Sequence, residues 1–129
     1  MPYYPPPSSS VGSTYYTWSE VTGTSQAAAV NNAYVANNAG LVTITLPTTA
    51  AVGDRILVVG KGAGGWKIAQ NASEQIIFRE GGTDAVDETT IGTGGSVAST
   101  DDYDSIELVC TTADTTWRCI SAKGNLTLV

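Results

Sequence analysis

The chain contains no histidine, and its charged residues are few and mostly acidic. Histidine is the commonest general base and metal ligand, so a Ser–His or Cys–His catalytic pair cannot be built within this chain. Six Lys and Arg against twelve Asp and Glu give a net charge of -6, and the basic residues are scattered singly. Because the phosphate backbone is bound by basic patches, we expect no nucleic-acid partner. The composition favours a non-enzymatic protein.

Long apolar runs are also missing. Hydrophobic residues make up 42% of the chain, but they come in short runs, well below the ~18–20 consecutive positions that a membrane span requires. We therefore expect no membrane insertion. The start, Met-Pro-Tyr-Tyr-Pro-Pro-Pro, has neither the positive charge nor the apolar core of a signal peptide. A chain of 129 residues is enough for one domain that buries roughly two-thirds of its unfolded surface.

Only two cysteines are present, Cys110 and Cys119. They flank a polar segment, 112–115, and would come close to opposite one another in a hairpin that turns near 114–115. A cross-strand disulfide would then need Cα atoms within ~4.4–6.8 Å. The alternative is two free thiols that pack as small apolar residues. The lack of a secretory signal favours the free thiols.

Short segments of alternating apolar and polar residues recur along the chain, separated by Gly, Pro and Asn. They lie at 42–46, 55–59, 66–70, 76–78, 105–110, 117–120 and 126–128. Segment 26–39 is also predicted to be extended, with a turn at 37–40, because its asparagines and β-branched residues oppose a helix. Strands that recur every ~8–12 residues predict an all-β fold, an antiparallel β-sandwich or a jelly-roll-like barrel. We expect one β-domain over residues 14–129.

A glycine-rich segment, 60–65, matches the spacing GxGxxG after a predicted strand. A dinucleotide site needs a helix after the glycines, whereas 66–70 alternates like a strand. No Gly-Lys-Ser/Thr ends the segment, so it is not a phosphate-binding P-loop either. We predict a hairpin tip whose glycines allow positive φ, followed by a third strand at 76–78. No cofactor is expected.

The first thirteen residues are rich in Pro, Ser and Gly and have no apolar periodicity. They predict an extended N-terminal arm, residues 1–13, with polyproline II structure at its three consecutive prolines. Tyrosines in or near the arm are candidates for partner contacts. The predicted assembly residues are Tyr3, Tyr4, Pro5, Pro6, Pro7, Tyr15 and Tyr16. In contrast, Trp66 and Trp117 lie in alternating strands and are predicted to pack in the core or a subunit interface.

Acidic residues cluster at 101–107 and at 84–88. The first cluster, Asp101, Asp102, Asp104 and Glu107, lacks the EF-hand pattern, so we predict solvated loop charge and no metal site. The second cluster has the same interpretation. Acidic and amide groups can also bind sugar hydroxyls, which makes loop residues candidates for facing a receptor: Asn71, Asp84, Asp87, Asp101, Asp102 and Tyr103. A glycan depolymerase with paired carboxylates would need a larger β-helical body, so an enzyme is disfavoured.

From residue 17 onward, the order of these segments resembles that of small β-domains of bacteriophage virion proteins, especially the C-terminal parts of tail-fibre-like proteins. The matching stretches are TGTSQ at 22–26, NNAY at 31–34, TLP at 45–47, VGD at 52–54, GWKIAQN at 65–71, SIELVC at 105–110, Trp117 and GN at 124–125. The pattern contains strands and turns but no catalytic motif. The resemblance implies an all-β domain that is homotrimeric and displayed on a particle surface.

The resemblance also implies a function. We expect a bacteriophage structural protein located at the virion surface, either a capsid decoration (cement) protein or a fibre knob, which binds other capsid or tail proteins. The alternative is a receptor-binding module that recognises a host-surface glycan. Tail-fibre proteins of this kind carry a long N-terminal attachment part. If this chain is complete, its arm or the base of its domain must provide the attachment.

Overall fold

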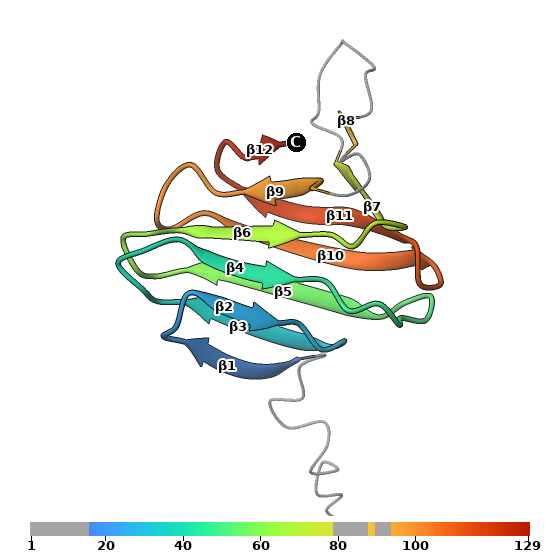
Figure 1. Ribbon diagram of the computed structural model, residues 1–129, viewed down its shortest axis with the longest axis horizontal. Helices are drawn as coiled ribbons and strands as arrows, with labels where there is room; N and C mark the ends of the chain where they lie inside the picture. The colour runs from blue at the N-terminus through green and yellow to red at the C-terminus, as the bar shows by residue number, and fades with distance from the viewer. Residues whose placement is uncertain (1–15, 79–87, 90–93) are drawn as a thin grey trace, which may run out of the picture.

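The protein is a sandwich of two β-sheets that pack face to face (Figure 1). The computed structural model describes residues 16–78, 88–89 and 94–129. Within these residues there are twelve strands and no helix, so no described helix could span a membrane. The predicted all-β sandwich is confirmed.

Seven strands form what we call the long sheet, and five form the short sheet. In spatial order the long sheet contains β1 (Thr17–Val21), β3 (Asn32–Ala36), β5 (Arg55–Gly60), β10 (Ser105–Thr112), β11 (Thr116–Lys123), β7 (Gln75–Phe78) and β8 (Glu88–Thr89). The short sheet contains β12 (Thr127–Leu128), β9 (Ser96–Ala98), β6 (Trp66–Ala69), β4 (Val42–Thr45) and β2 (Ser25–Ala27). The predicted strands are all present. Segment 26–39 contains most of β2 and all of β3, but a turn at 30–31, which was not predicted, separates them.

The first six strands alternate between the two sheets. Strands β1, β3 and β5 are therefore parallel neighbours in the long sheet, and β2, β4 and β6 are parallel neighbours in the short sheet. Each pair, β1–β2, β3–β4 and β5–β6, makes one coil, and the three coils stack (Figure 1). The last six strands complete both sheets. Most of them pair antiparallel, although β7 runs parallel to β11.

The predicted antiparallel pairing is therefore wrong for the first half of the domain. Segment 60–65 joins β5 in the long sheet to β6 in the short sheet, so it is an arch between sheets and not a hairpin tip. Strand β7 pairs with β11 and β8 instead of joining that hairpin. Alternation shows which face of a strand is buried, but it is the same for parallel and antiparallel partners. The second predicted hairpin, β10–β11, is confirmed.

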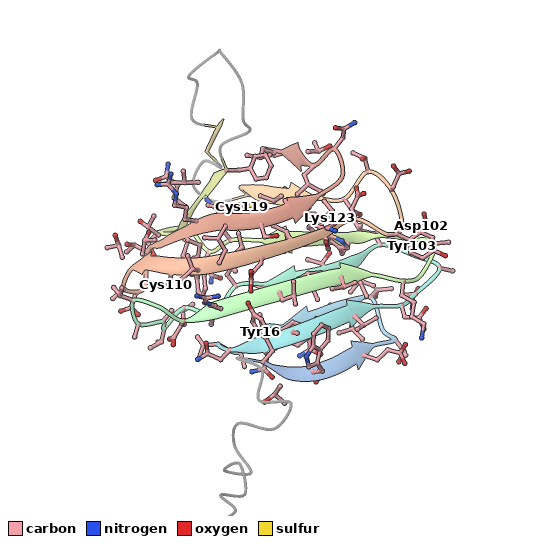
Figure 2. All side chains as sticks on the ribbon, turned by 180° about the vertical axis from the view of Figure 1, so that it is seen from behind. Tyr16, Asp102, Tyr103, Cys110, Cys119 and Lys123 are labelled. Carbon is pink, nitrogen blue, oxygen red and sulfur yellow. The ribbon has the colours of Figure 1, made fainter. Side chains whose placement is uncertain are left out.

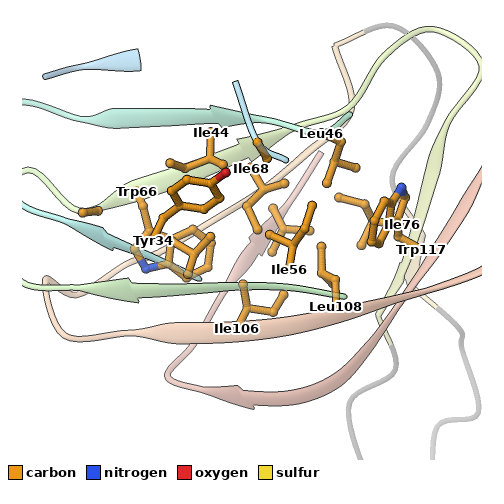
Figure 3. Close-up of a cluster of buried hydrophobic side chains, with 14 of the residues drawn as sticks. Tyr34, Ile44, Leu46, Ile56, Trp66, Ile68, Ile76, Ile106, Leu108 and Trp117 are labelled. Atoms are coloured by element: carbon orange, nitrogen blue, oxygen red, sulfur yellow. The ribbon is translucent and has the colours of Figure 1, made fainter. Parts of the chain in front are cut away.

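The core lies between the sheets and is built mainly from branched aliphatic side chains (Figure 3). Ile44 and Ile68 are register partners in the short sheet, and Ile56 and Leu108 are register partners in the long sheet. All four are completely buried, and full burial of one such side chain contributes about 1.5–3 kcal/mol. Trp66 and Trp117 are also fully buried, as predicted.

The two cysteines are free thiols, which confirms the favoured alternative. In the β10–β11 register Cys110 lies opposite Trp117, and Cys119 lies opposite Leu108. The two sulfur atoms therefore do not face each other. Burial raises the pKa of both thiols above the ordinary range, so both favour the protonated, unreactive form.

Candidate interaction surfaces

Three arches, residues 22–24, 37–41 and 61–65, stack at one end of the sandwich (Figure 1). A Cβ atom on Gly64 would lie 1.9 Å from the carbonyl oxygen of Gly40, and one on Gly62 would lie 2.4 Å from the amide nitrogen of Asn38. Within the glycine-rich segment, only Gly65 has a positive φ, 67°. Most of these glycines therefore allow one arch to approach the next. The segment is scaffold and does not form a ligand cradle.

Polar side chains bind the stacked arches together at their edge. The Lys61 ammonium lies 2.8 Å from a carboxylate oxygen of Glu20, and the Asn37 amide donates to the same oxygen at 3.1 Å. The hydrogen bond and charge of Lys61 hold the pKa of the Glu20 carboxyl below its usual range. The three residues come from three successive coils, so the cluster links the coils at the surface. It has no evident ligand.

The acidic loop 101–104 is organised around a buried carboxylate. One oxygen of Asp104 accepts hydrogen bonds from the backbone amides of Thr100 (2.9 Å) and Asp101 (3.0 Å), and Asp104 is buried. Its carbonyl oxygen accepts the indole N–H of Trp66 at 2.8 Å. The prediction of solvated charge was therefore wrong for Asp104, which caps the turn. Short acidic side chains commonly bond nearby backbone amides in this way.

The same turn presents its other side chains to solvent. Tyr103 is 75% exposed, Asp101 is exposed and Asp102 is partly exposed. Figure 2 shows Asp102 and Tyr103 together at one end of the sandwich. Of the sequence-predicted receptor-facing residues, Asp84 and Asp87 lie outside the described residues. No group of three His, Cys, Asp or Glu side chains suited to a metal ion occurs within the described ranges.

Asn71, another receptor candidate, is engaged within the domain. Its side-chain amide donates to the carbonyl oxygen of Leu46 at 2.9 Å and to the carboxylate of Glu74 at 2.7 Å. These bonds join the connection after β6 to the end of the β4 segment. Asn71 is therefore a structural residue, and it does not join the group around Tyr103.

The outer face of the long sheet is unexpectedly apolar. Because Ile56, Val58, Ile106 and Leu108 point into the core, the residues that alternate with them point outward. Apolar side chains in register on this outer face are Trp18, Ala33, Val35, Leu57, Val59, Ile77 and Val109. A bulge in β11 places Ile120 beside Ser121 opposite Glu107, and Ile120 is 46% exposed. Ala33 is completely buried although it is not part of the core between the sheets.

Tyr16 lies on this outer face (Figure 2). Its hydroxyl donates a hydrogen bond to the carboxylate of Glu107 in β10, and the same carboxylate oxygen lies 3.8 Å from the Arg55 guanidinium. The rings of Tyr16 and Trp18 meet edge to face, with centroids 6.5 Å apart. Burial, followed by the hydrogen bond to Glu107, raises the pKa of Tyr16 far above its ordinary value. The prediction of solvated loop charge was therefore wrong for Glu107, which lies in a strand and is bonded to Tyr16.

The outer face of the short sheet has a different composition. Its outward residues in register are small or hydroxylated, apart from one lysine: Ser25, Ala27, Thr43, Thr45, Lys67, Ala69, Ala98 and Thr127. The apolar outer face of the long sheet was not predicted from the sequence. The signal was present, because 55–59 is apolar at Leu57 and Val59 as well as at the alternating core positions.

Of the predicted assembly residues, only Tyr16 lies within the described part, where it contacts Glu107 on the outer face of the long sheet. The others, Tyr3, Tyr4, Pro5, Pro6, Pro7 and Tyr15, lie outside it. The described surface thus offers two places for a partner, the outer face of the long sheet and the loop around Tyr103.

No protein-family model matches the chain, and no curated protein sequence is significantly similar to it.

Proposed function

We propose that this protein is a non-enzymatic structural protein of a bacteriophage particle, a trimeric β-domain displayed at the virion surface and attached through its N-terminal arm. The role is that of a capsid decoration protein or a fibre knob. The proposal starts from the resemblance of the strand and turn pattern to virion β-domains. It is supported by the contacts of Tyr16, which lies shortly after the predicted arm.

The observation that carries the proposal is the fixed position of Tyr16, the first described residue after the predicted arm. Its hydroxyl is bonded to Glu107 of β10, so the residue that precedes the edge strand β1 is tied to the centre of the long sheet. The Arg55 guanidinium approaches the same carboxylate. A tether that must hold a domain on a particle benefits from such an anchor, because a load on the arm is shared by several strands.

The arm itself has the composition of a contact segment. Residues 1–13 carry no charged side chain and include Tyr3, Tyr4 and four prolines. Tyrosine is enriched at protein interfaces, and proline reduces the conformational entropy that a segment loses on binding. Such a segment can bind a groove between neighbouring virion subunits without a basic or acidic complement.

The test is attachment to particles that lack this protein. Purified full-length chain is mixed with such particles, and the bound copies are counted after sedimentation. A variant without residues 1–13 should lose binding while its circular dichroism spectrum stays unchanged. A variant with the same thirteen residues in scrambled order controls for length and composition and should also fail to bind. Equal binding of the truncated and full-length chains would remove the attachment role of the arm.

A second candidate function, recognition of a host-surface glycan, is favoured by the loop around Tyr103. An aromatic ring that is 75% exposed stands beside Asp101 and Asp102 on a turn that Asp104 holds in place. Sugar rings can pack on aromatic faces while carboxylates accept their hydroxyl protons. This arrangement suits a shallow carbohydrate site.

A glycan array and a whole-cell adsorption assay test this second function. Tyr103→Ala should abolish binding, whereas Val52→Ala should not, because Val52 is a similarly exposed side chain (70%) on a different loop. The absence of binding by the unmodified chain to any glycan or cell surface would exclude the receptor role. It would leave the structural role untouched.

A further inference from the structure

We propose that copies of this chain contact one another through the outer face of the long sheet. This inference rests on the trimer of the proposed function and names the surface that forms it. The face spans β1 to β11, that is, four strand spacings, and its strands have five to eight residues. At ~4.8 Å between strands and ~3.3 Å per residue, it covers roughly 400 Å² in projection. This area includes charged positions such as Arg55 and Glu107, so the apolar patch itself is smaller. The largest apolar patch on a soluble monomer is typically about 300–600 Å² and is often functional.

Large apolar side chains stand exposed at both sides of this face. Trp18 on β1 is 50% exposed and Ile120 on β11 is 46% exposed. Between them Leu57, Val59 and Val109 are half-buried, with their outward surfaces uncovered by the described chain. A buried aromatic anchor surrounded by aliphatic side chains is the usual centre of a stable protein interface. The outer face of the short sheet offers no comparable anchor.

The carboxylate at the centre of the face is already paired within the chain. Glu107, which lies in register with Leu57, is bonded to the Tyr16 hydroxyl and approached by Arg55. A partner that covers this region would therefore not strand an unpaired carboxylate, which is the usual cost of burying a charge. The central part of the face can be dehydrated at low cost.

The charge at the β11 side of the face indicates the occupant. Arg118 and Lys123 project from this side, and neither has an acidic partner within the described residues. The chain as a whole carries a net charge of -6, and Asp101 and Asp114 lie in exposed loops. A second copy thus supplies carboxylates to these cations, which have none among the described residues. Because unlike patches would meet, the contact is heterologous, and such contacts close into rings such as trimers.

The experiment measures the mass of the full-length chain by sedimentation from about 1 to about 100 μM, a range that covers ordinary subunit affinities. Trp18→Glu and Ile120→Glu place a charge on the face, and each should weaken assembly at least tenfold. Leu41→Glu is the matched control, because Leu41 is 47% exposed but lies in the arch 37–41, away from the face. It should assemble like the unmodified chain. Urea unfolding of each variant confirms that the domain remains folded.

Charge reversal tests the occupant. Arg118→Glu with Lys123→Glu should also weaken assembly, and added salt should weaken the unmodified assembly, since attraction between exposed charges is screened. The heterologous pairing would be overturned if neither the charge-reversal variant nor added salt changed assembly while Trp18→Glu still weakened it.

Three further outcomes would contradict the inference. An intact trimer for both Trp18→Glu and Ile120→Glu would overturn the assignment of the face while leaving the trimer of the proposed function standing. A monomer at every concentration would overturn the trimer itself, and the inference with it. Hydrogen exchange offers the third outcome. If removal of residues 1–13 deprotects β3, β5 and β10 independently of protein concentration, the arm covers this face, and a second copy does not.

Discussion

The first six strands and the last six strands complete the same two sheets, but they are connected differently. In the first half each strand crosses to the other sheet, so its neighbours belong to adjacent coils and equivalent arches stack on one another. In the second half β10 and β11 are joined directly by a short turn, and their pairing includes two register irregularities. The stacked coils therefore depend on close approach of backbones, and the closing strands tolerate bulges.

The polar groups show the same difference. In the coils, asparagine side chains bond the backbone of an adjacent coil. The Asn31 amide oxygen accepts the Arg55 N–H at 3.0 Å, and the Asn38 amide donates to the Thr22 carbonyl at 2.6 Å. Asn31 also adopts a φ of 60°, which asparagine tolerates better than most residues. The closing half contains instead a buried carboxylate, Asp104, that caps a turn. Loss of a glycine should thus damage the coils most, and loss of a carboxylate should damage the closing strands most.

The largest effect is expected at the arch of the third coil. Gly64→Ala would place a Cβ 1.9 Å from the Gly40 carbonyl oxygen, so two backbones must separate. We expect a loss of about 3 kcal/mol in the free energy of unfolding, the upper range for an overpacked site. Urea denaturation measures it.

The matched control is Gly23→Ala in the first arch. Nothing lies within 4 Å of a Cβ at Gly23, and its φ is not in the positive range. This variant should be unchanged or up to about 1 kcal/mol more stable, because alanine restricts the unfolded chain. If both variants have the stability of the unmodified chain, the stacked arches do not require their glycines.

The next largest effect is expected in the closing half. Asp104→Ala removes a buried carboxylate and leaves the amides of Thr100 and Asp101 without their acceptor. We expect a loss of about 2–3 kcal/mol by thermal or urea unfolding. Asp101→Ala, three residues earlier and exposed, should change stability by less than about 0.5 kcal/mol. Equal losses in the two variants would show that the turn is held by charge alone and not by the cap.

A pair of tryptophans compares the two halves directly. Trp66 and Trp117 are both completely buried. The Trp66 indole N–H donates to the Asp104 carbonyl, whereas the Trp117 indole N–H has no partner among the described residues. Replacement by phenylalanine removes similar volume from each site. Trp66→Phe should therefore be more destabilising than Trp117→Phe by about 1 kcal/mol, the net value of one hydrogen bond. The reverse order in urea unfolding would contradict this assignment.

Much of the fold could be predicted from the residues. Alternation at Val42 and Ile44 revealed a strand and its buried face, and the buried positions of both core tryptophans followed in the same way. The pairing partners could not be predicted, because Ile56 has the same inward direction beside a parallel or an antiparallel neighbour. The glycines at 60–65 suggested freedom of φ. Their role is mostly contact with another arch, which is distant in sequence.

The candidate surfaces were harder to predict than the fold. Tyr103 was predicted to face outward because it lies in a polar loop between two strands. In contrast, Asp104 and Glu107 could not be distinguished from solvated acids, since their partners, Trp66 and Tyr16, are far away in the sequence. The outer face of the long sheet was missed for a similar reason. Leu57 and Val59 lie in a run that is equally consistent with a strand buried on both sides.

The smallest effect is expected at the link between the two halves, from Tyr16 at the start of the coils to Glu107 in β10. Because Tyr16 is partly exposed, Tyr16→Phe should cost about 1 kcal/mol or less at neutral pH. The pH dependence is more diagnostic. The pKa of Tyr16 is raised in the folded chain from an ordinary value of 10.0, so its stabilising contribution is complete below pH 10 and is lost as the pH rises further. Urea unfolding of both proteins from pH 8 to 11 should show a stability difference that narrows above about pH 10. A difference that stays constant across this range would show that the hydroxyl does not bind Glu107 in solution.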